Sequence, residues 1–302
     1  MEPNRRLPVW RSLLFVPTNV DRFVDKAHTR GADAIVLDLE DGVAASEKED
    51  ARCRVMKATE TVSQGSCDVL VRINRPWRMA LKDLEATICP AVQALALPKV
   101  DSSEQVQILS EITSELESER GMAVGATQFF VSIETVAGFM HMQAIAAADE
   151  RVVAIGLGAG DFSLCTGLFP GPEELTYPNL KIVIAARAAG CLPLGLLSTI
   201  DDYTDLDRFR MLARRSRRLG LRGSACVHPQ QVPILNEEFS PTEEELARAR
   251  RVIAAFEEAS ATGAGAIEVD GKMVDFPVVQ GARALLESYE AIQDRARRAT
   301  RS

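Results

Sequence analysis

Short apolar runs recur along this chain and alternate with longer segments that have the periodicity of an amphipathic helix. The apolar runs cover residues 12–16, 34–39, 69–73, 94–97, 128–133, 152–156, 194–198 and 224–228. Helical patterns lie between several of them, at 21–30, 46–61, 102–119, 136–148 and 205–219. Runs that are apolar on both faces are typical of parallel strands covered by helices. Eight such units in succession favour a (β/α)8 TIM barrel over an open doubly wound sheet.

The C-terminal part of the chain does not continue this alternation. A helix predicted over 240–265 begins with Ser-Pro-Thr and has a carboxylate-rich first turn. Residues 266–279 predict a hairpin that turns at Asp270 and Gly271, and a final helix runs to about Arg297. We therefore expect a barrel domain at 1–235 and a C-terminal extension at 236–302 that contains a helix, a hairpin lid and a final helix.

The charge of the chain limits its partners. The net charge is -8 and the pI is near 5.2, so no overall field attracts nucleic acid or an anionic membrane surface. The apolar run near the N-terminus is too short for a signal sequence, and no uninterrupted apolar stretch is long enough to span a membrane. We expect a cytoplasmic protein in which local cations meet any anionic substrate.

Polar residues follow most of the predicted strands. In a TIM barrel the C-terminal ends of the strands face the active site, so such residues are candidates for function. The segment GADAIVLDLEDGV (31–43) shows this best, because an apolar run ends in three carboxylates. The candidates selected in this way are Asp38, Glu40, Asp41, Arg72, Lys99, Glu134, Asp161 and His228.

Glu134 and Asp161 are the best candidates for metal ligands. They follow neighbouring strands, which lie about 4.8 Å apart, so both carboxylates can converge on one ion. Two carboxylates with positions open for water and substrate suit Mg²⁺, or Mn²⁺ in its place. The chain has only three histidines, which also directs attention to carboxylates. The alternatives are a helix N-cap at Asp161 and a salt bridge at Glu134.

The basic candidates have structural alternatives too. Arg72 interrupts an apolar strand and needs an anionic partner, which is either a substrate or the carboxylates at 38–41. Lys99 fits an ordinary polar lining residue better than a Schiff-base lysine. His228 fits a turn before the next helix better than a catalytic base.

Several motifs together resemble one known family. They are RSLLFVP, KAHTRGADAIVLDLEDGV, VRIN, LPKV, SIET, GAGDF, HPQQ and DGKMVDFP, in order from Arg11 to about Pro277. In this order and spacing they resemble the citrate lyase β-subunit-like and malyl-CoA lyase family of CoA-ester lyases. That family is similar to the phosphoenolpyruvate-binding barrels, which are usually trimers or hexamers that use Mg²⁺. The resemblance implies a homotrimer or homohexamer that binds a CoA thioester and a small oxo acid.

The resemblance also implies roles for single residues. Glu134 matches the glutamate of the family's I-E-T motif and Asp161 the aspartate of its G-A-E-D motif, the two metal ligands. Arg72 matches the arginine of V-R-x-N, which contacts substrate oxygens near the metal. Asp275 matches the aspartate of the C-terminal G-x-M-[VI]-D-x-P motif, which reaches a neighbouring subunit's site as acid and base.

Other positions carry weaker expectations. The resemblance places Asp38, Glu40 and Asp41 in a second layer that holds metal-bound water and Arg72. Arg22 and Lys26 are candidate contacts for CoA phosphates, although solvated helix charges explain them almost as well.

Two positions depart from the family's pattern. Thr18 replaces its usual glycine after F-V-P, and Gly160 replaces the glutamate before the metal aspartate. Both departures lie where substrate is expected, so the acyl group accepted can differ from malyl or citryl.

The implied chemistry is reversible Claisen-type cleavage of a 3-hydroxyacyl-CoA such as malyl-CoA, β-methylmalyl-CoA or citramalyl-CoA. The products are an oxo acid, glyoxylate or pyruvate, and acetyl-CoA or propionyl-CoA. Three alternatives stay open: a malyl-CoA thioesterase with malate synthase-like activity, an aldolase that acts on free oxo acids, and a non-autonomous acyl-CoA-binding subunit of a citrate lyase-type complex.

Overall fold

The computed structural model describes residues 7–261 and 265–299, and it divides the chain into two compact units, 1–239 and 240–302. The predicted end of the barrel at residue 235 lies within helix α9 (Gln231–Glu238), which belongs wholly to the first unit. That the two units are separate domains stays a prediction.

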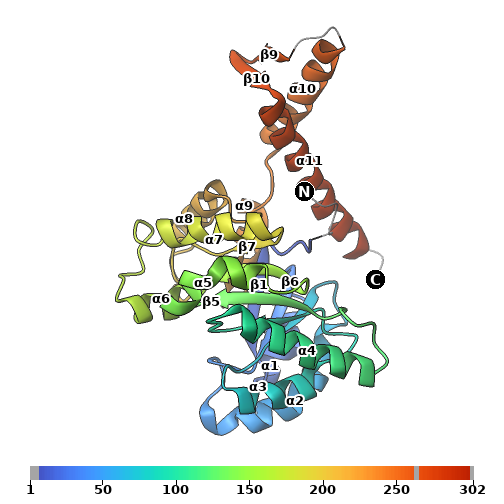
Figure 1. Ribbon diagram of the computed structural model, residues 1–302, viewed down its shortest axis with the longest axis vertical. Helices are drawn as coiled ribbons and strands as arrows, with labels where there is room; N and C mark the ends of the chain where they lie inside the picture. The colour runs from blue at the N-terminus through green and yellow to red at the C-terminus, as the bar shows by residue number, and fades with distance from the viewer. Residues whose placement is uncertain (1–6, 262–264, 300–302) are drawn as a thin grey trace. The chain divides into compact units, whose positions relative to one another are not determined.

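The described residues of the first unit form eight parallel strands, one at or beside each apolar run (Figure 1). They are β1 (Ser12–Pro17), β2 (Ala34–Asp38), β3 (Asp68–Arg72), β4 (Ala94–Leu97), β5 (Gln128–Ile133), β6 (Val152–Leu157), β7 (Leu192–Leu194) and β8 (Ser224–Cys226). Consecutive strands from β1 to β7 are neighbours, and β8 pairs with the other edge of β1. The predicted TIM-barrel fold is confirmed.

The ends of this ladder, β7 and β8, meet through the backbone beside them. The amide of Gly195 donates to the carbonyl of Gly223 at 2.9 Å, and the amide of Arg222 donates to the carbonyl of Pro193 at 2.9 Å. These two bonds close the barrel between its two shortest strands.

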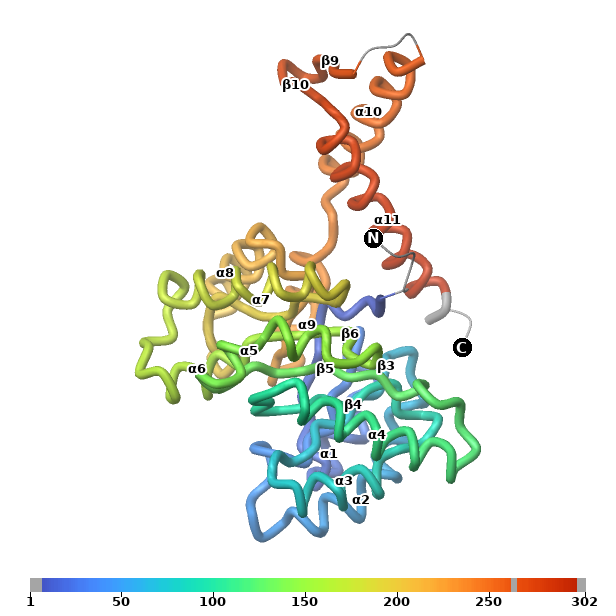
Figure 2. The backbone as a smooth tube through the Cα atoms, viewed as in Figure 1, coloured from blue at the N-terminus to red at the C-terminus, as the bar shows by residue number. Residues whose placement is uncertain are grey.

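Helices follow the strands along the chain and pack outside them, as the tube in Figure 2 allows the reader to trace. In this unit they are α1 (Asp21–Ala27), α2 (Lys48–Val62), α3 (Trp77–Thr87), α4 (Ser103–Glu119), α5 (Val136–Ala146), α6 (Ala159–Thr166), α7 (Thr176–Ala189), α8 (Leu206–Leu219) and α9, with a short 3-10 helix at Ala45–Glu47. Two helices, α6 and α7, lie between β6 and β7, where the repeating unit of a TIM barrel has one.

Side-chain alternation divides the apolar residues of the strands into two layers. On β2, Ile35 and Leu37 join the core between strands and helices, whereas Ala34 and Val36 join the core inside the barrel. Continuing this alternation by one step puts Asp38 on the inner side, at the end of the strand. Arg72 reaches the same level because it is paired in register with Asp38. A strand that ends in a carboxylate therefore delivers that carboxylate to the barrel mouth.

One strand differs from its prediction. We expect a strand over 194–198, but β7 covers Leu192–Leu194 and ends before Gly195. Gly195 has a φ of +154°, and a Cβ at that position would lie 2.5 Å from Oδ1 of Asn179. Leu196 and Leu197 beyond it are buried in the outer core. The apolar run at 194–198 therefore correctly indicates a buried segment, but most of that segment is not paired as a strand.

The second unit contains the predicted helix, hairpin and final helix. They are α10 (Glu243–Ser260), β9 (Ala266–Val269), β10 (Lys272–Asp275) and α11 (Phe276–Ala299). A capping box at Thr242 and Glu245 begins α10. The hairpin ends at Asp275, earlier than the predicted residue 279, because Pro277 suits the first turn of a helix.

A small core holds this unit together. Val252, Val274 and Val279 are buried, and Phe256 and Ile267 pack against them. No helix within residues 7–261 and 265–299 combines the length and apolar character that a membrane crossing requires.

Candidate functional site

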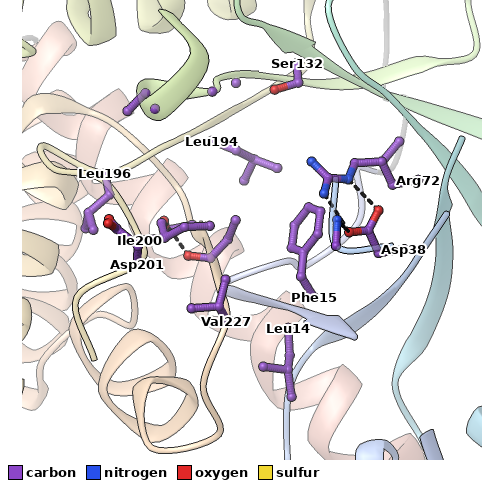
Figure 3. A pocket seen from close by; sticks show the side chains of 18 of the residues that line it. Leu14, Phe15, Asp38, Arg72, Ser132, Leu194, Leu196, Ile200, Asp201 and Val227 are labelled. Carbon is purple, nitrogen blue, oxygen red and sulfur yellow. Dashed lines mark hydrogen bonds and ion pairs between the residues drawn. The ribbon is translucent and has the colours of Figure 1, made fainter. Parts of the chain in front are cut away.

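A pocket of about 750 Å³ opens at the C-terminal ends of the barrel strands. Asp38, Arg72, Glu134 and Asp161 line it, so it gathers residues from β2, β3, and the segments after β5 and β6. Much of the remaining wall is apolar: Figure 3 labels Leu194, Leu196, Ile200 and Val227 away from the ion pair, and Phe15 beside Arg72. The pocket thus combines a cluster of charged residues with a largely apolar wall that also includes Asp201 and His228.

Asp38 and Arg72 form a two-point ion pair in this wall (Figure 3). Nε of Arg72 donates to Oδ1 of Asp38 at 2.7 Å and Nη2 donates to Oδ2 at 2.6 Å. The Asp38 carboxylate also accepts the amides of Glu40 at 2.8 Å and Gly42 at 2.9 Å. Burial would lower the pKa of Arg72, but the bonds to Asp38 outweigh it and raise that pKa. The structural alternative for Arg72, a pair with these carboxylates, is present.

Gly42 and Phe15 fix this pair from either side. A Cβ at Gly42 would lie 2.4 Å from Oδ2 of Asp38, so the loop can approach the carboxylate only with glycine there. The guanidinium of Arg72 lies 4.9 Å from the centre of the Phe15 ring, within range of a cation–π contact. These contacts fix the orientation of the Arg72 guanidinium. Its Nη1 also lies 3.0 Å from Oε2 of Glu40.

Lys99 pairs with Glu40 and Asp41, the two carboxylates that follow Asp38 in the chain. Its Nζ lies 2.5 Å from Oε1 of Glu40 and 2.8 Å from Oδ2 of Asp41. Burial raises the pKa of Glu40 against the opposing effects of Arg72 and Lys99. Partial burial would also raise the pKa of Asp41, but its hydrogen bond with Lys99 prevails and lowers it. Glu40 is buried, whereas the Asp41 side chain is 59% exposed.

The two predicted metal ligands come together at the same place. Oε2 of Glu134 and Oδ1 of Asp161 each lie 3.7 Å from Nζ of Lys99. Glu134 is 4% exposed, and its Oε2 has no hydrogen-bond partner among the residues that the structure describes. Burial raises the pKa of Glu134 to about 7, with the negative charge of Glu40 adding to the effect. A cation beside Glu134 would offset the cost of its buried charge.

These residues fit a divalent metal ion. Within the described parts of the chain, no group of three or more His, Cys, Asp or Glu side chains is arranged around a common metal position. The protein would therefore supply the Glu134 and Asp161 oxygens and leave other positions for water or substrate, as Mg²⁺ prefers. The cluster also carries excess negative charge, because its five carboxylates outnumber the two cations that contact them. The carboxylates are those of Asp38, Glu40, Asp41, Glu134 and Asp161.

Two glycines in the 158–160 segment leave space beside the side chains of these candidate ligands. A Cβ at Gly158 would lie 2.4 Å from Cγ of Glu134, so only glycine leaves that side chain in place. A Cβ at Gly160 meets no atom within 4 Å, and the position lines the pocket. The departure at Gly160 therefore leaves open space beside Asp161. At the other departure, the hydroxyl of Thr18 donates to the carbonyl of Asp38 at 2.9 Å.

Helix α1 and the residues just after it contribute to the pocket with different side chains from those expected. Arg22 and Lys26 are exposed, whereas Phe23, Ala27 and Arg30 line the pocket. Contact of Arg22 and Lys26 with CoA stays a prediction, and Arg30 is a basic side chain of the pocket wall that sequence reasoning missed. Its only sequence signal is its position at the end of the helical pattern predicted over 21–30, whereas in the structure α1 ends at Ala27 and Arg30 follows it.

The remaining candidates have clear surroundings. His228 lines the pocket, its Nδ1 accepts the amide of Gln230 at 3.3 Å, and its ring stacks on Tyr203, so it orders the turn before α9. Asp275 belongs to the second unit, where it ends β10 and directly precedes α11. Its role as acid and base in the barrel site stays a prediction.

Comparison with known proteins adds to this geometry. Residues 11–229 match the family model described as HpcH/HpaI aldolase/citrate lyase. The chain is 35% identical over 284 residues to the citrate lyase subunit beta of Leuconostoc mesenteroides subsp. cremoris, covering 93% of each chain. It is 32% identical over 305 residues to the L-malyl-CoA/beta-methylmalyl-CoA lyase of Cereibacter sphaeroides, covering 93% of this chain and 95% of that one.

A solved structure shares the fold over most of its length. It is the protein CitE from Mycobacterium tuberculosis in complex with magnesium, acetoacetate and coenzyme A. The TM-score is 0.72 at 29% sequence identity, and the match covers 92% of this chain and 97% of that chain. Both the barrel and much of the second unit thus have a counterpart in a protein that binds magnesium and coenzyme A.

Proposed function

Because the chain belongs to the HpcH/HpaI aldolase/citrate lyase family, a family of carbon–carbon lyases, we propose that it is a Mg²⁺-dependent CoA-ester lyase. Its substrate would be a 3-hydroxyacyl-CoA such as malyl-CoA, β-methylmalyl-CoA or citramalyl-CoA. The products would be glyoxylate or pyruvate together with acetyl-CoA or propionyl-CoA. The observation that carries this proposal is the convergence of Glu134 and Asp161 in a pocket that also contains Arg72.

Glu134 and Asp161 would hold the Mg²⁺, which when bound supplies Lewis acidity to the hydroxyl and carboxylate oxygens of the substrate. Arg72 keeps its charge because its pKa is raised, and its fixed position suits stabilisation of negative charge on the reacting oxygens. Asp38 holds the guanidinium in that position through two hydrogen bonds. The apolar wall around Leu194, Leu196 and Val227 would exclude water from the reacting carbons.

The bond changes are those of a retro-Claisen cleavage. The substrate hydroxyl would give its proton to solvent water, the bond between the carbinol carbon and the carbon next to the thioester would break, and an oxo acid would leave. The electron pair of that bond remains on the thioester as an enolate. Asp275, supplied by a neighbouring subunit, would give a proton to the enolate carbon and so form acetyl-CoA or propionyl-CoA. In the condensing direction the same carboxylate would remove that proton.

The proposal is tested by incubating purified protein with the three CoA esters, with Mg²⁺ or with EDTA, and measuring oxo acid and free thiol separately. Mg²⁺-dependent release of oxo acid without free thiol is the expected result, and it names the acyl group. Free thiol instead would identify a thioesterase. No reaction with any ester would reject the proposed autonomous activity.

A second candidate is favoured by the relatives themselves. The matching protein from Leuconostoc mesenteroides is a subunit of citrate lyase, and a citrate lyase subunit beta from Escherichia coli is 33% identical over 294 residues. The chain would then act within a complex, on an acyl group presented by another subunit. Activity that appears only on addition of the other citrate lyase subunits would support this candidate over an independent lyase.

A further inference from the structure

Lys99 has an unusual backbone conformation at the centre of the carboxylate cluster. Its φ is +52°, and among the described residues only one other non-glycine residue, Asp270, has a positive φ. A lysine in this left-handed region costs of order 1–3 kcal/mol unless its surroundings hold it there. In this conformation the side chain of Lys99 lies among four carboxylates. Its Nζ is 2.5 Å from Glu40, 2.8 Å from Asp41 and 3.7 Å from both Glu134 and Asp161.

Neighbouring side chains maintain this conformation. Nε of Arg75 donates to the carbonyl of Lys99 at 3.2 Å, and Nη2 of the same guanidinium donates to Oδ2 of Asp101 at 3.1 Å. The other oxygen of Asp101 accepts the hydroxyl of Thr135 at 2.5 Å. Thr135 directly follows Glu134 and caps helix α5. The backbone of Lys99 and the backbone of Glu134 are therefore fixed to the same network.

The contacts of Lys99 differ in closeness. Hydrogen bonds join its ammonium to Glu40 and Asp41, whereas its distances to Glu134 and Asp161 are those of ion pairs without hydrogen bonds. Oε2 of Glu134 accordingly still lacks a hydrogen-bond partner among the described residues. Glu40 and Asp41 therefore fix the ammonium by hydrogen bonds, whereas Glu134 and Asp161 interact with it only through their charge.

We propose that Lys99 is a built-in counter-ion that competes with the divalent metal for Glu134 and Asp161 and thereby weakens metal binding. This inference rests on the proposed function, because it assumes that these two residues are the ligands. Two cations that share the same two carboxylates repel each other, and near a partly buried site this repulsion amounts to a few kcal/mol. Lys99 is thus a positioning residue that stabilises the carboxylates without metal and keeps the metal exchangeable.

The test is a calorimetric titration with MgCl₂ of the full chain and of Lys99→Met. We expect the variant to bind Mg²⁺ at least about tenfold more tightly. Its thermal midpoint in EDTA should fall below that of the unaltered protein, and Mg²⁺ should raise it by a larger amount. Lys99→Arg keeps the charge and should keep the weaker affinity. Lys82→Met is the matched control, because Lys82 is an exposed lysine that pairs with Glu49 at 3.9 Å.

Equal or weaker Mg²⁺ binding by Lys99→Met than by the unaltered protein would overturn the competition. If that variant does not fold, Lys99→Gln repeats the test, since it can keep a hydrogen bond to Glu40 without the charge. Absence of Mg²⁺ binding in the unaltered protein and in all variants would instead reject the ligand assignment within the proposed function, and the role of Lys99 with it.

Discussion

At the scale of single residues, the candidate site depends on close approach between backbone and carboxylate. Gly158 follows β6 and passes Glu134 so closely that a Cβ would lie 2.4 Å from Cγ and 2.9 Å from Oε1 of that side chain. The φ of Gly158 is −78°, which any residue can adopt, so space alone and not backbone freedom requires glycine.

Gly158→Ala should therefore displace Glu134 and weaken Mg²⁺ binding by about tenfold or more, because a ligand oxygen moves away from the shared position. Gly160→Ala is the control, since its new methyl group would meet no atom within 4 Å. It should leave Mg²⁺ binding unchanged and raise stability by about 0.5–1 kcal/mol through helix propensity. Titration with MgCl₂ and thermal unfolding measure both effects, and equal Mg²⁺ affinity in the two variants would contradict this account.

The sequence predicts single residues well where a strand end fixes them. Asp38, Arg72, Glu134 and Asp161 follow from the barrel rule, and the structure brings all four to one pocket. The same rule selects Lys99, for which the sequence predicts only an ordinary polar lining residue. Its contacts depend on a positive φ that Arg75 maintains from another loop, and no local pattern reveals such a conformation.

At the scale of elements, a buried ion pair ties helix α4 to the start of β6. Arg151 donates to both oxygens of Glu117, at 2.9 and 2.7 Å, and the two side chains are 4% and 0% exposed. The same carboxylate accepts the amides of Gly125 at 2.8 Å and Thr127 at 2.6 Å. Burial would raise the pKa of Glu117, but the bond from Arg151 and these amides lower it below its ordinary value of 4.5.

The sign of the resulting pH dependence follows from this shift. Because the folded carboxyl binds its proton less tightly than the unfolded one, Glu117 contributes stability above about pH 4.5, and that contribution is lost as pH falls through the folded pKa. Glu117→Gln should cost about 3–5 kcal/mol at neutral pH, since it leaves Arg151 buried without a charged partner. The difference from the unaltered protein should shrink in acid.

Urea unfolding of the full chain from neutral pH into acid measures this prediction. Glu115→Gln is the control on the same helix, because Glu115 is exposed and its replacement should change stability by less than about 0.5 kcal/mol. A Glu117→Gln deficit that is constant across the pH range would show that the charge of Glu117 is not its source.

Elements are predicted best where burial and strand pairing coincide. The apolar runs on β2 and β5 are strands because both faces of those strands are covered. The run at 194–198 is equally apolar, yet its residues after Gly195 leave the ladder and remain buried. Hydrophobicity predicts whether a segment is buried, but not where strand pairing ends. Here β7 ends where Asn179, which is distant in sequence, approaches Gly195.

At the scale of the whole molecule, the proposed chemistry joins residues from different units. The proposed metal ligands belong to the barrel unit and Asp275 to the C-terminal unit. The family resemblance predicts that Asp275 serves a neighbouring subunit of a homotrimer or homohexamer.

Mixed subunits test this arrangement directly. Glu134→Gln and Asp275→Asn chains should each be inactive alone, since one lacks a metal ligand and the other the acid. Co-expression of both should restore oxo-acid release at about one site in four, because those sites receive intact groups from two different chains. Asp270→Asn is the control in the same hairpin, where asparagine tolerates the φ of +53°, and it should keep its activity. Failure of complementation would place Asp275 in the site of its own chain.

The order of the strands has a consequence for how the metal site assembles. The clustered charges come from β2, β3 and the segments after β4, β5 and β6, and these five strands are consecutive along the chain and adjacent in the ladder. None comes from β8, whose pairing with β1 joins segments more distant in sequence than any other pair of neighbouring strands. Closing that seam has the largest loop entropy to overcome and is therefore expected late in folding. The carboxylates can meet before then, so a nascent chain can acquire its metal while the barrel is still open.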